Sequence, residues 1–223
     1  MCNRYGYLAP ISKLIDEFSH TRLPLIFEGG ALPNLPPREH IRPTEVAPII
    51  RPLNPAEPFA GVALVQARWW LIPFFHRKSV KEWKPMCTNA RAETVSTTPA
   101  FRESFKRRRC LVPATHFFEW TGEKGAKVMW KFTLTGAEMF CFAGLWDRAE
   151  TSDGPVESFT IVTRAAGPDC APYHTRQPVT LDRANWETWL DLTRDPAPLI
   201  AAAPDEASGR ITVERAVGET TLA

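Results

Sequence analysis

The sequence predicts an α+β fold, a single domain over residues 1–223 built on a largely antiparallel, barrel-like β-sheet with helices at its periphery. Three observations lead to this prediction. Short segments rich in β-branched and aromatic residues recur along the chain, three of them follow one another with glycine turns between residues 110 and 146, and only three segments have helical spacing. With 223 residues, of which 44% are hydrophobic, the chain is long enough for one sizeable core.

The most regular strand pattern lies in the middle of the chain. Turns at residues 122–125 and 135–136 contain glycine and separate three strand-like segments. In the second of these segments, apolar side chains alternate with more polar ones, so one face is expected to lie on the core. The predicted strands cover residues 46–50, 61–73, 110–120, 127–134, 139–146, 158–163 and 211–213.

Three helices are predicted outside this pattern. Residues 10–18 have apolar side chains at positions 11, 14, 15 and 18, with a proline in the first turn. Residues 99–107 form a second helix with its basic side chains toward water, and residues 182–190 a third, capped by Asp182. The proline-rich residues 23–58 are expected to loop over the body in extended form, and residues 195–204 to form an exposed segment.

The composition excludes several classes of protein. The longest apolar run, residues 59–67, is about half as long as a membrane helix, and an apolar signal segment is missing. We therefore expect a soluble, cytoplasmic protein, and a monomer. Five cysteines without a CxxC pair and five histidines without HxH or HxxxH spacing predict neither a disulfide framework nor a metal site, and no cofactor is expected.

The formal net charge is +2, and part of the positive charge is concentrated in and directly after the helix predicted over residues 99–107. The basic residues of this cluster are Arg102, Lys106, Arg107, Arg108 and Arg109. Such a run fits a partner with a phosphate backbone, and it fits a solvated helix face equally well.

Cys2 is the residue with the most distinctive chemistry. If Met1 is removed, which a small side chain at position 2 permits, Cys2 carries a free α-amine beside its thiol. Because the pKa of an α-amine is about 8, roughly a tenth of it is uncharged at neutral pH. Such an amine can condense with an aldehyde to an imine, and the sulfur can then close a thiazolidine ring. The alternative is that Cys2 is only a small hydrophobe at a chain end.

Four other positions hold polar groups where a core would favour apolar ones. Asn89 follows a loop, Glu119 lies between two aromatic residues, Thr163 ends a strand, and His174 precedes an apolar stretch. Each is weak alone, since a lone glutamate or histidine is usually exposed. Together with Cys2 they supply the nucleophile, amide, acid and base that imine chemistry uses.

Several motifs in fixed order resemble the SOS-response-associated peptidase (SRAP) family. They are Met1-Cys2-Asn3-Arg4, Asn89-Ala90-Arg91-Ala92-Glu93-Thr94, Arg109-Cys110-Leu111-Val112-Pro113-Ala114, Phe118-Glu119-Trp120, Phe159-Thr160-Ile161-Val162-Thr163, His174-Thr175-Arg176-Gln177-Pro178-Val179 and Val213-Glu214-Arg215-Ala216-Val217-Gly218. The resemblance implies a sensor of abasic sites in single-stranded DNA that joins itself to them through a thiazolidine on residue 2. An older interpretation of the family makes it a group of peptidases that use the same cysteine.

The resemblance also implies roles for individual residues. Cys2 attacks C1′ of the opened sugar, Glu119 acts as the acid that opens the closed sugar, and His174 assists proton transfer. Asn89 holds the Cys2 backbone and the sugar ring, and Thr163 is expected to do the same.

DNA contacts are implied by the same resemblance. The side chains that it assigns to phosphates are Arg4, Arg91 and Arg176. Phe74 and Phe75 stand where bases flanking the lesion stack or are wedged apart. The alternative is that both phenylalanines belong to the core.

Two other functions are consistent with the sequence. One is a thiol peptidase that acts on other proteins, although the sequence has no substrate-binding signature for it. The other is a non-covalent single-strand DNA module in which Cys2 has no chemical role. Crosslinking to an abasic oligonucleotide separates both from covalent capture.

Overall fold

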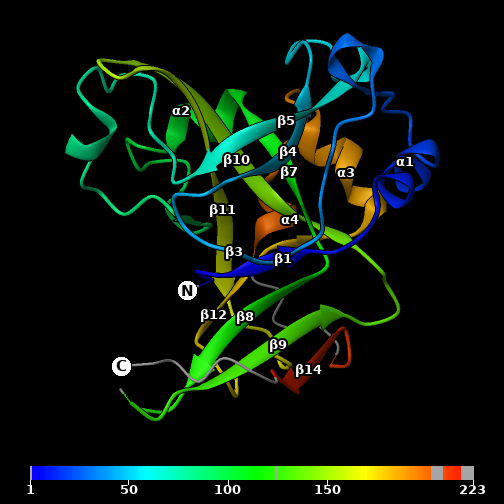
Figure 1. The fold of residues 1–223 in the computed structure, drawn as a ribbon, viewed down its shortest axis with the longest axis vertical. Helices are drawn as coiled ribbons and strands as arrows, with labels where there is room; N and C mark the ends of the chain where they lie inside the picture. Colours follow the sequence, from blue (N-terminus) through cyan, green and yellow to red (C-terminus); the bar gives the residue numbers. More distant parts are fainter. Residues whose placement is uncertain (1, 124, 202–207, 217–223) are drawn as a thin grey trace.

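A computed structural model describes residues 2–123, 125–201 and 208–216. Its centre is a closed ring of five strands in which β11 returns to β5 (Figure 1). The β5–β11 pairing is parallel, and the other four pairings in the ring are antiparallel. The ring consists of β4 (Val46–Pro52), β5 (Val62–Trp69), β7 (Arg109–Ala114), β10 (Phe140–Thr151) and β11 (Gly154–Ala165). The predicted α+β fold with a barrel-like, largely antiparallel sheet is confirmed.

A second sheet lies beside the barrel, at the bottom of Figure 1. Its strands follow the order β14–β9–β8–β1–β3, all of them antiparallel neighbours. They are β1 (Tyr5–Tyr7), β3 (Arg38–Ile41), β8 (His116–Thr121), β9 (Val128–Leu134) and β14 (Ile211–Arg215).

Short strands and peripheral helices complete the described part of the fold. The short strands are β2 (Leu25–Ile26), β6 (Asn89–Arg91), β12 (Arg176–Pro178) and β13 (Thr180–Leu181). The α-helices are α1 (Ile11–Ser19), α2 (Arg102–Arg107), α3 (Arg183–Leu190) and α4 (Ala197–Ile200), and the 3-10 turns are η1 (Glu28–Gly30), η2 (Pro58–Ala60) and η3 (Val80–Glu82).

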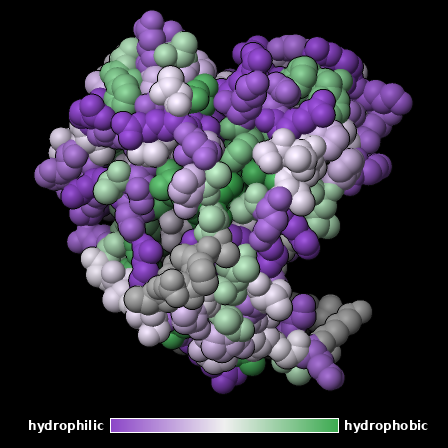
Figure 2. Space-filling model, turned by 180° about the vertical axis from the view of Figure 1, so that it is seen from behind, coloured by the Kyte–Doolittle hydropathy of each residue, from purple (hydrophilic) through white to green (hydrophobic). Residues whose placement is uncertain are grey.

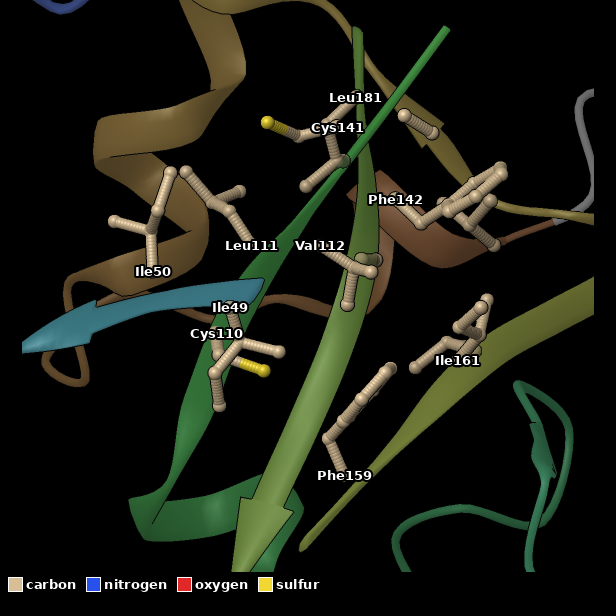
Figure 3. Packing of buried hydrophobic residues seen from close by; sticks show 14 of the residues in the cluster. Ile49, Ile50, Cys110, Leu111, Val112, Cys141, Phe142, Phe159, Ile161 and Leu181 are labelled. Carbon is tan, nitrogen blue, oxygen red and sulfur yellow. The ribbon is translucent and has the colours of Figure 1, made fainter. Parts of the chain in front are cut away.

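Apolar side chains from the barrel strands meet inside it (Figure 3). Phe142 is fully buried there, and Leu111, on the opposite face of the sheet, is equally buried, as are the helix residues Trp186 and Trp189. The indole of Trp186 donates to the carbonyl of Leu181 at 3.1 Å, and that of Trp189 to the carbonyl of Cys110 at 2.8 Å. These bonds satisfy the buried N–H groups and fasten α3 to the sheet.

The structure corrects the predicted strand over residues 110–120. The chain leaves the barrel after Ala114 and joins the second sheet at His116, so one expected strand is two strands of different sheets. At the break, the Thr115 amide donates to the carbonyl of Gly6 at 2.9 Å. The period-2 pattern continues across this bend, and therefore the sequence does not reveal it.

Other predicted boundaries also change. The looping region 23–58 contains β3, which pairs with β1, and the strand expected over 61–73 ends at Trp69. Asp182 precedes α3 but makes no side-chain cap, because its carboxylate accepts from Arg210 Nη2 at 2.9 Å. Met1 and the last residues of the segment predicted over 195–204 lie outside the described residues.

The basic run over residues 102–109 is only partly a surface feature. Arg109 is 3% exposed, and it donates from Nε to the carbonyl of Trp189 and from Nη2 to that of Asp191, both at 2.6 Å. Arg108 instead pairs with the buried carboxylate of Asp147 at 3.1 Å. The interpretation of all five cations as one solvated or DNA-facing cluster is therefore wrong.

No helix among the described residues is long and apolar enough to cross a membrane. Within the same ranges, no group of three or more histidine, cysteine, aspartate or glutamate side chains is placed to hold a metal ion.

The buried guanidinium of Arg109 yields a stability prediction. Burial lowers its pKa to about 10, so it remains charged while it binds two carbonyls at the end of α3. Replacing Arg109 by Ala leaves these carbonyls without their donor, and we expect a loss of roughly 3 kcal/mol in the free energy of unfolding. Denaturant unfolding measures it, and the exposed Arg107→Ala should change it by less than about 0.5 kcal/mol. Equal effects of the two variants would refute the structural role of Arg109.

Candidate functional site

The first described residues lead away from β1 into the body of the protein. Cys2 is 1% exposed, and its carbonyl accepts from Nδ2 of Asn89 at 2.8 Å. Its Sγ lies 3.6 Å from the carbonyl of Arg4. Figure 2 shows the surface hollowed between the barrel and the second sheet, on the side where Figure 1 places the N-terminal end.

Asn89 is held in place by β11. The short strand β6 runs parallel to β11, with Asn89 opposite Ile161 and Arg91 opposite Thr163. The Asn89 side chain is buried and also donates to Thr88 Oγ1 at 3.3 Å. The structure thus brings an uncharged donor from the barrel edge to the backbone of Cys2.

Glu119 approaches the same place from the second sheet. Strand β8 pairs with β1, the Phe118 amide donates to the carbonyl of Arg4 at 2.9 Å, and one more step along β8 reaches Glu119. Glu119 is 4% exposed, and burial raises its pKa to about 7. Near neutral pH, this carboxyl therefore exists in both its acid and its base form.

The thiol of Cys2 responds to the same surroundings. Burial raises its pKa, and the charge of the Glu119 carboxylate raises it further. The thiol is consequently protonated at neutral pH, and its proton must be taken up by a base before the sulfur can act as a thiolate.

His174 lies in the loop before β12. The neighbouring Tyr173 packs on Trp130, with ring centroids 4.8 Å apart, and Trp130 is the cross-strand partner of Glu119. Nδ1 of His174 lies 2.9 Å from the amide nitrogen and 3.0 Å from the carbonyl oxygen of Arg176, so the Arg176 backbone fixes the orientation of the ring. Because burial lowers its pKa, the imidazole favours its neutral form.

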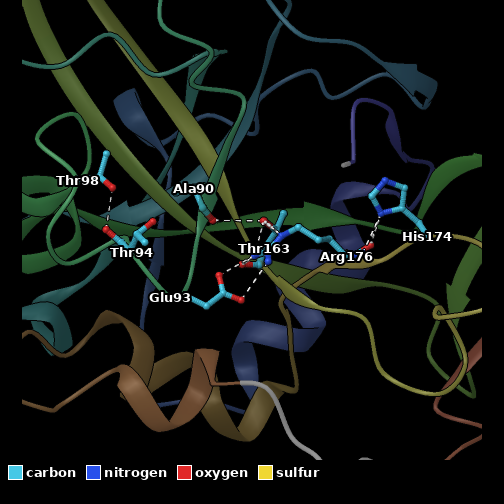
Figure 4. A network of polar contacts seen from close by, with 7 residues as sticks. All are labelled: Ala90, Glu93, Thr94, Thr98, Thr163, His174 and Arg176. Atoms are coloured by element: carbon cyan, nitrogen blue, oxygen red, sulfur yellow. Dashed lines mark hydrogen bonds and ion pairs between the residues drawn. The ribbon is translucent and has the colours of Figure 1, made fainter.

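Arg176 belongs to a polar network at the end of β11 (Figure 4). Its two terminal nitrogens donate to the two carboxylate oxygens of Glu93 at 3.0 and 2.9 Å. Nη2 also donates to the Thr163 carbonyl at 2.7 Å, and Nε lies 3.4 Å from Thr163 Oγ1. Thr163 thus contacts Arg176 directly, whereas its proposed contact with the sugar is untested.

Arg4 and Arg91 lie in different settings. The Arg4 guanidinium lies over the Trp120 ring at 5.0 Å, with Nη1 3.7 Å from the sulfur of Met129. Arg91 is exposed on β6 beside Thr163. Among the described residues, no carboxylate forms an ion pair with Arg91 within 4.0 Å.

Phe74 and Phe75 are 42% and 46% exposed, so the alternative that they belong to the core is wrong. Their rings meet edge to face with centroids 5.6 Å apart, and the Arg108 guanidinium lies over Phe74 at 5.5 Å. Asp147 fixes this arrangement, since its carboxylate accepts from the Phe74 amide at 3.0 Å and pairs with Arg108.

The site residues are thus brought together to different degrees. Cys2 is bonded to Asn89 and interacts with the charge of Glu119, while His174 lies on a loop packed opposite Glu119. Phe74 and Phe75 lie beside a different part of β11, near Ser158. The Ser158 hydroxyl accepts from the amide of Ile72, two residues before Phe74, at 2.8 Å. Ser158 is three residues from Ile161, the partner of Asn89, which corresponds to about 10 Å along a strand.

Some residues of the site were missed as functional candidates in the sequence. Glu93 and Trp120 are part of recognised motifs but received no role of their own, and Tyr173 and Asp147 had no signal beyond aromatic or acidic character. Their partners, respectively Arg4, Trp130 and Phe74, are distant in sequence. Only the folded chain reveals these pairs.

The family model for SOS response associated peptidases (SRAP) matches residues 1–220. The chain is 30% identical over 193 residues to the abasic site processing protein YoqW of Bacillus subtilis, which covers 86% of this chain and 80% of that protein. Over 140 residues it is 27% identical to the abasic site processing protein YedK of Escherichia coli, covering 60% of this chain and 63% of that one.

Solved structures share the fold. A protein from Bacteroides thetaiotaomicron superposes with a TM-score of 0.78 at 23% identity, covering 96% of this chain and 91% of that one. A protein from Bordetella bronchiseptica gives a TM-score of 0.76 at 23% identity, covering 96% and 99%.

Burial of Glu119 predicts a pH-dependent stability. Its pKa rises from 4.5 to about 7 on folding, so between these values the unfolded state loses a proton that the folded state keeps. The free energy of unfolding therefore falls as the pH rises through this window. In Glu119→Gln this contribution is absent, and the stability of the variant relative to wild type should increase by roughly 3 kcal/mol between pH 4.5 and pH 7.5.

Denaturant unfolding of both proteins at the two pH values measures this difference. A difference that stays constant with pH would show that the carboxyl keeps its ordinary pKa in the folded protein.

Proposed function

Because the chain belongs to the SOS response associated peptidase family, we propose that it processes abasic sites in single-stranded DNA by joining Cys2 covalently to the lesion. The family relationship confirms the resemblance seen in the motifs. The observation that carries the proposal is the convergence on Cys2 of the Asn89 amide and the Glu119 carboxyl. The relatives named abasic site processing proteins support the choice of lesion.

The first chemical step opens the sugar. An abasic deoxyribose is mostly a closed hemiacetal, and breaking the bond from C1′ to the ring oxygen requires a proton on that oxygen. With a pKa of about 7, Glu119 holds a proton in a fraction of molecules large enough to donate it. The hydroxyl group on C1′ gives its proton to water as this bond breaks, which leaves an aldehyde at C1′.

The second stage forms two bonds to C1′. Once Met1 is removed, the uncharged α-amine of Cys2 attacks the aldehyde, and loss of water gives an imine. The sulfur then adds to the imine carbon while its proton moves to the nitrogen, which completes a thiazolidine. Glu119, now ionised, is the base that takes the thiol proton as the sulfur attacks and delivers it to the imine nitrogen. Because burial and the Glu119 charge raise the thiol pKa, this proton moves together with formation of the S–C bond and not before it.

His174 and Asn89 assist these steps without adding charge. The neutral imidazole exchanges a proton with the departing water, and the contacts of its Nδ1 with the Arg176 backbone fix its orientation. The Asn89 side chain fixes the carbonyl of Cys2 and so limits the positions that the amine can adopt.

Basic and aromatic side chains then hold the strand. Arg4, Arg91 and Arg176 bind phosphates on either side of the lesion, with Thr163 beside them. The exposed rings of Phe74 and Phe75 stack with bases farther along the strand. A single strand suits this arrangement because its bases are free to stack.

Covalent capture is tested with a denaturing gel. Protein freed of Met1 is mixed with a 5′-labelled single-stranded oligonucleotide that carries one abasic site. We expect a shifted band that survives denaturation, and its loss in Cys2→Ala and in protein that retains Met1, because both lack the aminothiol.

Other outcomes identify the other functions. A shift seen only on native gels, and weakened by salt, indicates a non-covalent single-strand module. Cleavage of an unrelated protein in the absence of DNA indicates a thiol peptidase. Either result without a denaturation-resistant band would refute covalent capture.

Stacking on the exposed phenylalanines yields a binding prediction. A tetrahydrofuran analogue of the abasic site cannot open to an aldehyde, so it reports binding without crosslinking. Phe74→Ala should weaken binding of an oligonucleotide with this analogue by about 1 to 3 kcal/mol, measured by fluorescence anisotropy. The control is Phe59→Ala, since Phe59 is similarly exposed but lies on η2 beneath Arg22. Equal effects of the two variants would count against a stacking role.

A further inference from the structure

The carboxylate of Glu93 occupies the guanidinium fork of Arg176. Glu93 follows β6 in a turn, and its two oxygens accept from Nη1 and Nη2 of Arg176 at 3.0 and 2.9 Å (Figure 4). This two-oxygen geometry is the one in which an arginine binds a phosphate group. The site at which Arg176 would hold DNA is therefore filled by an anion of the protein itself.

The remaining contacts of Arg176 hold it with its fork toward solvent. Nη2 donates to the carbonyl of Thr163 at 2.7 Å, and the Arg176 side chain is 13% exposed. The Glu93 side chain is 50% exposed and covers the fork from outside. Glu93 can consequently leave toward solvent while Thr163 keeps Arg176 in place.

Glu93 also lies in the field of a second arginine. The hydrogen bonds from Arg176 lower the pKa of Glu93, and the charge of Arg91 on β6 adds to this effect. The carboxylate thus lies between two cations that the proposed function assigns to DNA phosphates. A phosphodiester arriving there carries the same charge as the carboxylate it would replace.

We propose that Glu93 is a built-in phosphate mimic that occupies Arg176 in the DNA-free protein and is displaced by a backbone phosphodiester next to the abasic site. The proposal rests on the proposed function and adds a determinant of specificity to it. Because one monoanion replaces another, an undamaged strand gains little binding free energy when its phosphate displaces Glu93. A strand whose lesion also binds at Cys2 gains enough binding free energy to displace Glu93 from Arg176.

Binding to undamaged DNA tests the mimic without depending on crosslinking. The probe is a fluorescent oligothymidylate, and its dissociation constant is measured by anisotropy over a series of salt concentrations for wild type and Glu93→Gln. Glu93→Gln should bind about three- to tenfold more tightly at low salt, because the carboxylate that competes with the DNA phosphate for Arg176 is lost. The slope of log affinity against log salt should steepen by roughly 0.7, which corresponds to one more phosphate contact.

The matched control is Glu187→Gln. Glu187 also binds an arginine through both Nε and Nη2, at 2.8 and 2.6 Å, but this partner is Arg22 and the pair joins the α1 and α3 regions. The control removes the same charge elsewhere and should leave binding close to wild type. If Glu93→Gln binds no more tightly than this control, or binds more weakly, Glu93 is a support for Arg176 and the mimic is refuted.

A second pair of variants excludes a general effect of charge. In an Arg176→Gln background, the gain from Glu93→Gln should largely vanish, and a gain that persists overturns the proposal. Should Glu93→Gln fail to fold, Glu93→Asp is measured instead. Its shorter side chain keeps the charge but reaches the fork less well, so it too should bind more tightly, and weaker binding overturns the proposal. If the wild-type protein does not crosslink, the proposed function is refuted. The binding measurements on undamaged DNA still test the role of Glu93, because they do not depend on crosslinking.

Discussion

The pairing of β11 is the constraint on which the site depends. One part of this strand pairs with β10 and, through Ser158 and Phe159, with β5, and these pairings close the barrel. Its last residues extend past the ring and pair with β6 on one edge and β12 on the other. Asn89, Thr163 and Arg176 are therefore gathered at one end of a strand whose other end is fixed by the barrel, and rigid elements position reacting groups better than loops do.

Local sequence patterns determine most of the elements but not how they join. The alternating pattern of β9 and the apolar spacing of α1 were visible because neighbours in sequence decide them. The division of residues 110–120 between two sheets was not, because Thr115 is fixed by a bond to Gly6, which is distant in sequence. The parallel β5–β11 contact that closes the ring has the same long-range character.

The site shows the same division. The residues proposed to react, Cys2, Glu119 and His174, could be named from the sequence together with the family resemblance, because each proposed role requires a particular type of side chain. The protonation states and partners of the site residues could not be predicted from the sequence. The pKa of about 7 at Glu119 comes from burial between sheets, and the engagement of Arg176 with Glu93 joins residues 83 positions apart. The basic run over residues 102–109 misleads for a similar reason, since burial of Arg109 depends on where α3 ends.

Burial separates the site into a neutral interior and a charged rim. Inside, desolvation raises the pKa of the Cys2 thiol and of Glu119 and lowers that of His174, so every shift favours the uncharged form. Imine formation and ring closure move protons between such groups and leave no net charge behind, and a poorly solvated interior opposes these steps least. Of the arginines, Arg91 is exposed to water, whereas Arg176 is mostly buried and balanced by the carboxylate of Glu93. In the proposed function, a strand bound at this rim places its neutral sugar inward and its phosphates at the arginines.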